Sequence, residues 1–243
     1  MTDTLAPAGT VHASEPAPTG PLTASTSLTS PASPLSEQLR TATRPQHEHA
    51  ETRGFVTDLM GGALSREAYA DLATQHHAVY TALEATGARL ADDAVAGPFV
   101  MDALVRVPSL EADLERLRGP GWRERAVLLP ATETYVERLS AITRAEEFLA
   151  HHYTRYLGDL SGGQIIARLL QRHYGMTPDE LTFYAFAAIP KPKPFKDAYR
   201  ALLDAAPLTQ EGIAAVVAEA KVAFDLNSAL FTALAPRHPA TAA

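Results

Sequence analysis

Hydrophobic and polar residues follow a helical order from residue 35 to about residue 234. Apolar side chains recur there at spacings of three and four residues, as expected for helices that bury one face. In the last long segment this face consists of Ile213, Val216, Val217, Ala220 and Phe224. Alternating strand patterns are scarce, and no internal repeat is visible. The pattern predicts a single all-α domain whose helices pack around a shared core.

Side chains that cap helices predict where three of these helices begin. Ser65 and Ser109 each stand at the start of a helical segment. Thr143 and Glu146 have the spacing of a capping box, in which each side chain binds a free backbone N–H group of the first turn. We therefore expect a long helix over about 145–175.

The two ends of the chain differ from this pattern. Residues 1–34 are dominated by Ala, Pro, Ser and Thr, and the first Lys or Arg of the chain is Arg40. Such a segment cannot bury enough apolar surface to offset the entropy that it would lose on ordering. We expect a disordered tail over 1–34, a folded domain over 35–236 and a short disordered tail over 237–243.

Composition narrows the possible functions. The 243 residues are 46% hydrophobic, which is enough for a sizeable core, and the formal net charge of -7 argues against sequence-independent binding of nucleic acid. The absence of cysteine excludes disulfides, iron–sulfur clusters and thiol nucleophiles. No apolar run reaches the roughly 20 residues that cross a membrane. We therefore expect a soluble, cytoplasmic protein.

Segment 156–164, YLGDLSGGQ, places three glycines inside a predicted helix. Each interior glycine costs about 1 kcal/mol of helix stability relative to alanine, so a compensating role is expected. The pentapeptide LSGGQ also occurs in ATP-binding cassettes, but no glycine-rich phosphate loop precedes any lysine of this chain. At about 100° per residue, one helix face holds Arg155, Gly158, Asp159, Gly162, Ile165, Ile166 and Leu169. Either a ligand approaches the bare backbone of this face, or another helix packs closely against it.

A second candidate site lies in segment 40–55, RTATRPQHEHAETRGF. As a helix, this segment places four side chains in one sector: Arg40, Arg44, His47 and Glu51. One imidazole beside two cations suits an anionic ligand that contains a metal. Glu51 stands where a zinc protease motif has its second histidine, and the E-x-x-H motif of di-iron bundles is absent. Pro45 would kink a helix interior but fits a first turn, and a surface helix with scattered charges is the alternative.

Five segments together resemble the heme oxygenase family, especially its soluble bacterial members. In chain order they are HEHAE, HAVYTALE, HHYTRYLGDLSGGQIIARLLQRHYG, FKDAYR and AKVAFDLN, and the likeness covers roughly 35–234. The resemblance implies that heme b, as cofactor and substrate, lies between a proximal and a distal helix. It implies further that His47 ligates the iron and that the neighbouring His49 does not. Gly158 and Gly162 would let the backbone of the distal helix approach the porphyrin.

The same resemblance assigns roles to polar residues. Asp159 matches the catalytic aspartate of the family, which acts through ordered water. The supporting polar network corresponds to Tyr80, Tyr135, Arg155 and Asn227. Candidate partners for the two heme propionates are Arg40, Arg44, Tyr153, Lys196 and Arg200. Retention of these positions implies cleavage at the α-meso carbon with O2, giving biliverdin, carbon monoxide and ferrous iron.

Electrons for this reaction would come from outside the chain, because no flavin or nicotinamide motif is visible. The resemblance implies a donor such as ferredoxin or a flavin reductase, and we expect a monomer or weak dimer. A heme carrier or sensor that lacks catalysis is the main alternative. A thiaminase-like enzyme on a related helical fold would lack its usual cysteine nucleophile.

Overall fold

The computed structural model describes residues 33–46 and 54–240, and within these ranges all regular structure is helical. The helices are α1 (Leu35–Ala42), α3 (Gly54–Gly61), α4 (Arg66–Arg89), α5 (Val107–Arg118), α6 (Trp122–Arg125), α7 (Pro130–Ser140), α8 (Ala145–His152), α9 (Gly158–Tyr174), α10 (Pro192–Asp204) and α11 (Gln210–Leu234). Short helical turns are η1 (Gly97–Phe99), η2 (Asp102–Leu104), η3 (Tyr153–Leu157), η4 (Pro178–Glu180), η5 (Thr182–Tyr184) and η6 (Ala235–Arg237). The all-α prediction is confirmed for the described residues.

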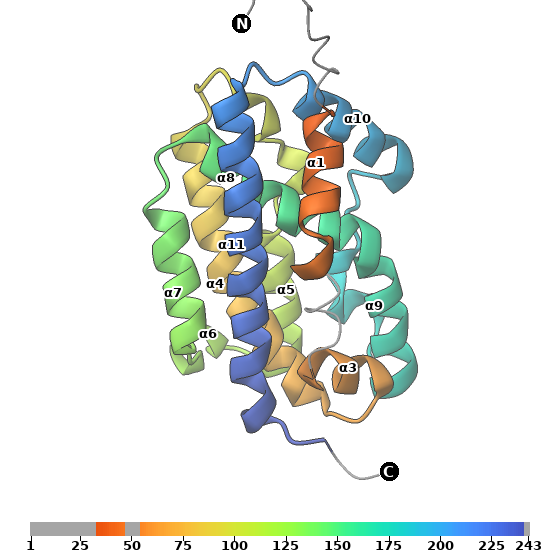
Figure 1. Cartoon of the computed structure of the whole chain (residues 1–243). Coiled ribbons are helices and arrows are strands. Elements are labelled where there is room, and N and C mark those ends of the chain that lie inside the picture. Colours follow the sequence, from red (N-terminus) through yellow and green to blue (C-terminus); the bar gives the residue numbers. More distant parts are fainter. Residues whose placement is uncertain (1–32, 47–53, 241–243) are drawn as a thin grey trace, which may run out of the picture. The chain divides into compact units, whose positions relative to one another are not determined.

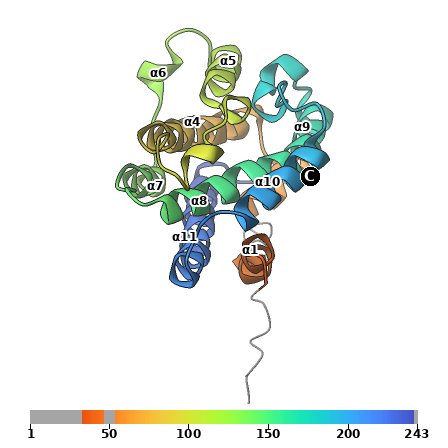
Figure 2. The same ribbon diagram turned by 90° about the horizontal axis from the view of Figure 1, so that it is seen from above.

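The core lies between α4, α7, α8 and α11, which pack against one another. Figure 1 shows α11 beside α8 and α7, and Figure 2 shows α8 between α4 and α11. Tyr80 of α4, Tyr135 of α7 and Phe148 of α8 are fully buried in this core. On one side α9 packs against α3 and α10, so the glycine-rich helix is held by elements from distant parts of the chain.

The predicted start of α4 is confirmed and that of α5 is wrong. Ser65 caps α4, since its side chain accepts a hydrogen bond from the backbone N–H of Ala68. α5 begins at Val107 and not at Ser109. The carboxylate of Glu84 caps it from α4, where Oε1 accepts the N–H groups of Arg106 at 2.6 Å and Val107 at 3.2 Å. A cap supplied by another helix leaves no local sequence signal.

The predicted capping box before α8 does not form. The residue that caps α8 is Arg144, which places Glu146 one position too early to bind back to the cap, and no side chain caps this end. The carboxylate of Glu146 instead lies 3.3 Å from the Arg144 guanidinium. The long helix also changes its winding, because η3 is a π-helical turn between α8 and α9. Such turns add one residue per turn and often occur at functional sites.

The chain near Pro45 also departs from one continuous helix. α1 ends at Ala42, where Thr43 donates its hydroxyl to the Leu39 carbonyl at 2.7 Å, and helical structure resumes at Arg44. Pro45 therefore lies in a first turn, where its missing N–H group is tolerated. The expected tail 1–34 lies outside the described residues except for its last two positions.

The carboxyl end is ordered further than the sequence predicts. Arg237 belongs to η6, and Nε2 of His238 lies 2.7 Å from Oδ2 of Asp71 on α4. The boundary expected at residue 236 is therefore wrong for these two residues, and residues 241–243 lie outside the described part. Within the described ranges, no helix is both long and apolar enough to span a membrane.

Candidate functional site

Two of the three glycines on α9 face open space, and the third does not. A Cβ atom built at Gly158 or Gly162 would have no described atom within 4 Å, apart from its own helix. A Cβ atom at Gly163 would lie 2.8 Å from the ring of Tyr184, too close for any real contact. Gly163 is therefore explained by packing, whereas Gly158 and Gly162 leave a strip of bare backbone that a flat ligand can approach.

Tyr80 and Asp159 meet beside this strip. The Tyr80 hydroxyl of α4 donates a hydrogen bond to Oδ2 of Asp159 in the first turn of α9. Burial raises the pKa of the Asp159 carboxyl well above its usual range. Asp159 can therefore exchange a proton under conditions in which most aspartates are fully ionised.

Arg155 lies in the π-helical turn and is 6% exposed. Its Nη1 donates to Oδ1 of Asn227 on α11 at 2.5 Å, and its guanidinium lies 5.0 Å from the centre of the Tyr80 ring. Nε and Nη2 are buried and have no hydrogen-bond partner within 33–46 and 54–240. Unpaired donors are costly in a protein interior, so these two nitrogens are available as donors to a ligand or to ordered water.

The predicted helix face needs one correction. A regular helix would place Arg155 on the same face as Gly158 and Gly162, but Arg155 is buried while Gly158 is exposed. The π-helical turn between them adds a residue to the turn and rotates Arg155 into the core. Arg155 therefore supports the site from behind and does not lie on the open strip.

Tyr135 of α7 contacts a histidine of α8. Its hydroxyl lies 3.3 Å from Nδ1 of His151, whose Nε2 lies 2.9 Å from Oε1 of Glu219 on α11. Arg155 and Tyr135 also interact electrostatically, although burial is the main cause that raises the pKa of Tyr135 to about 12. Tyr80, Tyr135, Arg155, Asp159 and Asn227 are thus brought together from α4, α7, η3, α9 and α11.

The predicted cations form a second group near Tyr153. Burial raises the pKa of the Tyr153 hydroxyl, while the nearby charges of Arg200 and Arg40 act in the opposite direction. Lys196, one turn before Arg200 on α10, donates to Oγ of Ser161 on α9 at 3.0 Å. The structure therefore places α1 and α10 cations close to the helix that carries the open glycines.

The predicted iron ligand lies outside the described residues, as do His49 and Glu51. Arg44 is described and exposed in the helical stretch 44–46. In the described ranges, no three His, Asp or Glu side chains gather as metal ligands. The role of His47 therefore stays a prediction.

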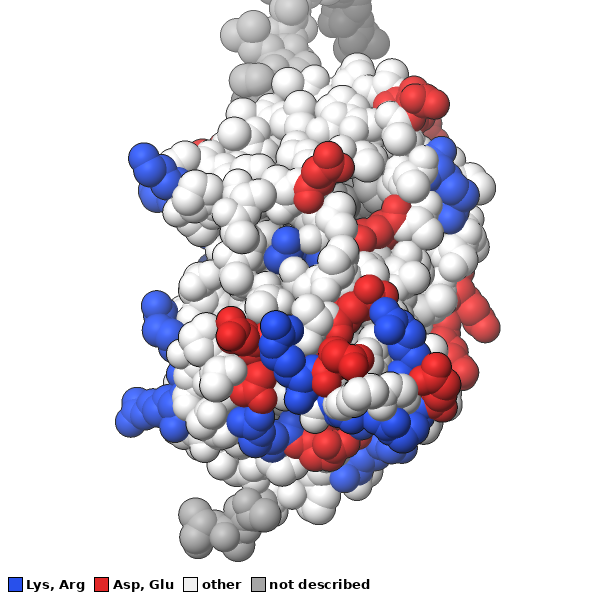
Figure 3. Space-filling model, turned by 180° about the vertical axis from the view of Figure 1, so that it is seen from behind, with Lys and Arg blue, Asp and Glu red and all other residues white. Residues whose placement is uncertain are grey.

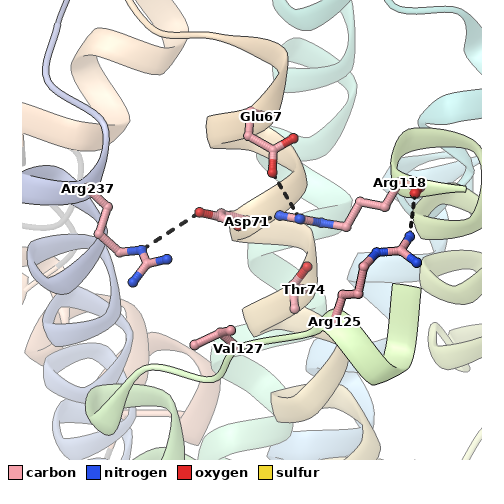
Figure 4. Close-up of a pocket in the computed structure, with 7 residues that line it drawn as sticks. All are labelled: Glu67, Asp71, Thr74, Arg118, Arg125, Val127 and Arg237. Atoms are coloured by element: carbon pink, nitrogen blue, oxygen red, sulfur yellow. Dashed lines mark hydrogen bonds and ion pairs between the residues drawn. The ribbon is translucent and has the colours of Figure 1, made fainter. Parts of the chain in front are cut away.

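A separate charged cavity of about 320 Å³ lies between α4, α5, α6 and η6 (Figure 4). Arg118 spans its wall, with Nη1 2.9 Å from Glu67 and Nη2 bound to Asp71. Arg125 donates to two backbone carbonyl groups, of Pro120 at 2.9 Å and of Arg118 at 2.8 Å. Three arginines and two carboxylates line this cavity, so positive and negative groups are mixed in it, as they are on the lower part of the face in Figure 3. Unlike α9, the described residues that line this cavity present no open strip of glycine backbone.

Sequence reasoning missed three residues that surround the site. His151 contacts Tyr135, and Glu219 contacts His151. Tyr184 packs on Gly163 and interacts electrostatically with Asp159. A signal for Glu219 was present, because it lies on the buried face of its helix between Val216 and Ala220. Tyr184 follows an irregular segment, so its position depends on the tertiary fold alone.

Comparisons with known proteins identify one family. The family model described as heme oxygenase matches residues 33–233. Heme oxygenase of Rhodella violacea is 38% identical over 203 residues, covering 82% of this chain and 86% of the relative. Heme oxygenase 1 of Rattus norvegicus is 38% identical over 205 residues, covering 82% of this chain and 71% of the relative.

Solved structures agree with these matches. The crystal structure of heme oxygenase-1 from Synechocystis in complex with heme has a TM-score of 0.81 and 35% identity, covering 84% of this chain and 94% of the other. Heme oxygenase from Leptospira interrogans has a TM-score of 0.79 and 32% identity, covering 82% and 99%.

Proposed function

The chain belongs to the heme oxygenase family, and from this membership we propose how its own residues bind and cleave heme. The family, the fold and the relatives agree that the protein is a heme-degrading oxidoreductase that forms biliverdin, with heme as both cofactor and substrate. The observation that carries the residue assignment is the open glycine strip beside the hydrogen-bonded pair of Asp159 and Tyr80.

The described residues fit a bound heme. Gly158 and Gly162 leave room for a flat macrocycle against the α9 backbone. The two unpartnered nitrogens of Arg155, Nε and Nη2, can bind ordered water. Bound heme supplies the iron that activates O2 and the meso carbon that is oxidised. The protein chain itself must bind the heme, orient it and supply protons to the site.

We assign the iron ligand to His47, which follows Arg44 by three residues and Arg40 by seven in the sequence. The propionates would be held by Arg40, Arg44, Tyr153, Lys196 and Arg200. Support for this clamp comes from the convergence of Arg40 and Arg200 on Tyr153 and from the contact of Lys196 with Ser161. A clamp of this kind fixes the rotation of the macrocycle, so we propose cleavage at the α-meso carbon.

Asp159 is the proposed proton-handling group. Its Oδ2 accepts from Tyr80, which leaves Oδ1 free to hold a proton and exchange it with ordered water. Burial raises the pKa of this carboxyl, which makes proton return at neutral pH feasible. Arg155 and Asn227 hold each other at 2.5 Å and keep the donors of the site in fixed directions.

Electron supply, assembly and location extend this proposal. We propose that ferredoxin or a flavin reductase delivers electrons, that the protein acts as a monomer or weak dimer, and that it works in the cytoplasm. Chromatography after one turnover of hemin with O2 and supplied electrons tests the activity and the α regiochemistry together. Biliverdin IXα is expected, and conversion that requires hydrogen peroxide would contradict the oxygenase assignment.

His47→Ala tests the ligand, with His49→Ala as a matched control two residues away. The absorption spectrum of the hemin complex is expected to change in the first variant and to stay the same in the second. A spectrum that changes only in His49→Ala would transfer the ligand role to His49.

A further inference from the structure

A continuous hydrogen-bonded chain leads from the site through α8 to the surface. The Tyr135 hydroxyl lies 3.3 Å from Nδ1 of His151, and Nε2 of His151 lies 2.9 Å from Oε1 of Glu219. Arg138 then binds both oxygens of Glu219, at 2.8 Å and 2.6 Å, and also contacts Glu147 at 3.2 Å. His151 is fully buried and Arg138 is 36% exposed, so the chain connects the core with solvent.

At the outer end of this hydrogen-bonded chain, the side chain of Glu219 has a fixed negative charge. Burial alone would favour the neutral acid, but the hydrogen bonds from His151 and Arg138 lower the pKa of Glu219 to about 2. Glu219 is therefore a carboxylate at neutral pH, and a carboxylate only accepts hydrogen bonds. Arg138 cannot lose its proton, so the direction of this contact does not change.

The charge of Glu219 determines which atoms of His151 and Tyr135 carry protons. Burial lowers the pKa of His151, so the ring is neutral at neutral pH and carries one N–H group. Nε2 faces the carboxylate and must be the donor, which leaves a lone pair on Nδ1. Tyr135 is protonated, since burial raises its pKa to about 12, and it therefore donates its O–H to Nδ1.

We propose that Glu219 and His151 are positioning residues that commit the Tyr135 proton to His151, so that the phenol oxygen can only accept hydrogen bonds at the site. The matching donors lie on Arg155, which interacts electrostatically with Tyr135 and has two nitrogens, Nε and Nη2, without a hydrogen-bond partner among the described residues. Proton donation at the site is then left to Tyr80 and Asp159. This last consequence rests on the proposed function, whereas the position of the Tyr135 proton does not.

The test uses ¹⁵N NMR of the full apo-protein, which reports the tautomer of each histidine ring. In the wild type we expect the His151 form with the proton on Nε2 to exceed the other form by more than about tenfold, as a charge-assisted hydrogen bond provides. Glu219→Leu removes the acceptor and is expected to give comparable amounts of both forms.

Arg138→Leu is the matched control. Both variants break the same ion pair, but only Glu219→Leu removes the acceptor of the His151 proton. The Nε2 form is therefore expected to persist in Arg138→Leu. A wild type with the proton on Nδ1 overturns the proposal without any variant, as does an unchanged tautomer in Glu219→Leu. If Glu219→Leu does not fold, the wild-type spectrum still decides.

Rates of bilin formation test the consequence for the site. Glu219→Leu is expected to slow single-turnover bilin formation by about three- to tenfold, and to cause no further loss when Tyr135 is already Phe. An equal loss in both backgrounds means that Glu219 does not act through Tyr135. If Tyr135→Phe alone leaves the rate unchanged, Tyr135 has no role in the proposed function, while the tautomer result stands separately.

Discussion

Arg155 and Arg118 are both largely shielded from solvent, but their surroundings differ. Arg118 places its two terminal nitrogens on two carboxylates, from Glu67 and Asp71, and only its buried Nε lacks a hydrogen-bond partner among the described residues. Arg155 has no carboxylate partner among the described residues, and two of its nitrogens are unpaired. An arginine whose charge is paired contributes to stability, whereas one without a carboxylate partner is tolerated where a ligand or water completes it. The contrast indicates that a missing counter-charge marks the functional site better than the presence of a cavity does.

The largest expected difference is in turnover. Asp159→Ala is expected to keep hemin binding and to lower bilin formation by about 100-fold or more, because the proton-handling group is lost. Asp71→Ala removes the same side chain from the charged cavity and is expected to leave turnover per folded molecule unchanged. Single-turnover rates measure both, and equal losses would remove the functional distinction between the two regions.

Substitutions in the charged cavity should change the stability of the fold. Arg118→Leu leaves Glu67 and Asp71 without their shared cation and is expected to lower the free energy of unfolding by about 1–2 kcal/mol. Arg116→Leu on the same helix is the control, since Arg116 is exposed and binds only a carbonyl of its own helix. Denaturant unfolding is the measurement. A turnover defect in folded Arg118→Leu protein would show that the charged cavity serves catalysis.

Alanine substitutions at the adjacent Gly162 and Gly163 should change the free energy of unfolding in opposite directions. Gly162→Ala fills open space and improves helix propensity, so the free energy of unfolding of the apo-protein should rise by about 0.5–1 kcal/mol while hemin affinity falls. Gly163→Ala drives a methyl group into the Tyr184 ring and should lower the same quantity by about 1 kcal/mol. Changes of the same sign in both variants would contradict the assignment of the open strip.

The smallest expected effect depends on pH. Burial raises the folded-state pKa of Asp159 above its ordinary value of 3.8, so its protonated form stabilises the fold. That contribution is complete below the unfolded-state pKa and is lost as pH rises through the folded-state pKa. Asp159→Asn stays neutral and keeps an acceptor for Tyr80. The variant should match the wild-type free energy of unfolding near pH 4 and exceed it by about 0.5–1 kcal/mol near pH 8.

The corresponding change in the charged cavity is Asp71→Asn. It removes the counter-charge of Arg118, so the free energy of unfolding should fall near pH 8. A gain in stability from Asp71→Asn would mean that ionised Asp71 does not stabilise the fold. No gain from Asp159→Asn would mean that ionised Asp159 does not destabilise it.

Much of the fold follows from local sequence signals. The helical periodicity predicts the all-α class, and Ser65 predicts the start of α4, because both depend on residues within one or two turns. The predictions for Ser109 and Thr143 are wrong for the opposite reason. α5 is capped by Glu84 from another helix, and α8 begins one residue later than the capping box requires.

The sequence by itself determined the family, the glycine segment and the residue types that heme chemistry needs, because the motif 153–164 is contiguous and specific. Only the tertiary structure decided which glycine faces open space and which one packs on Tyr184. It also decided that Arg155 turns inward and that Glu219 reaches Tyr135 through His151. These outcomes depend on contacts between residues far apart in the sequence, such as the 68 positions between His151 and Glu219, and on one extra residue in a helical turn. Neither changes the helical periodicity enough to be read from the sequence.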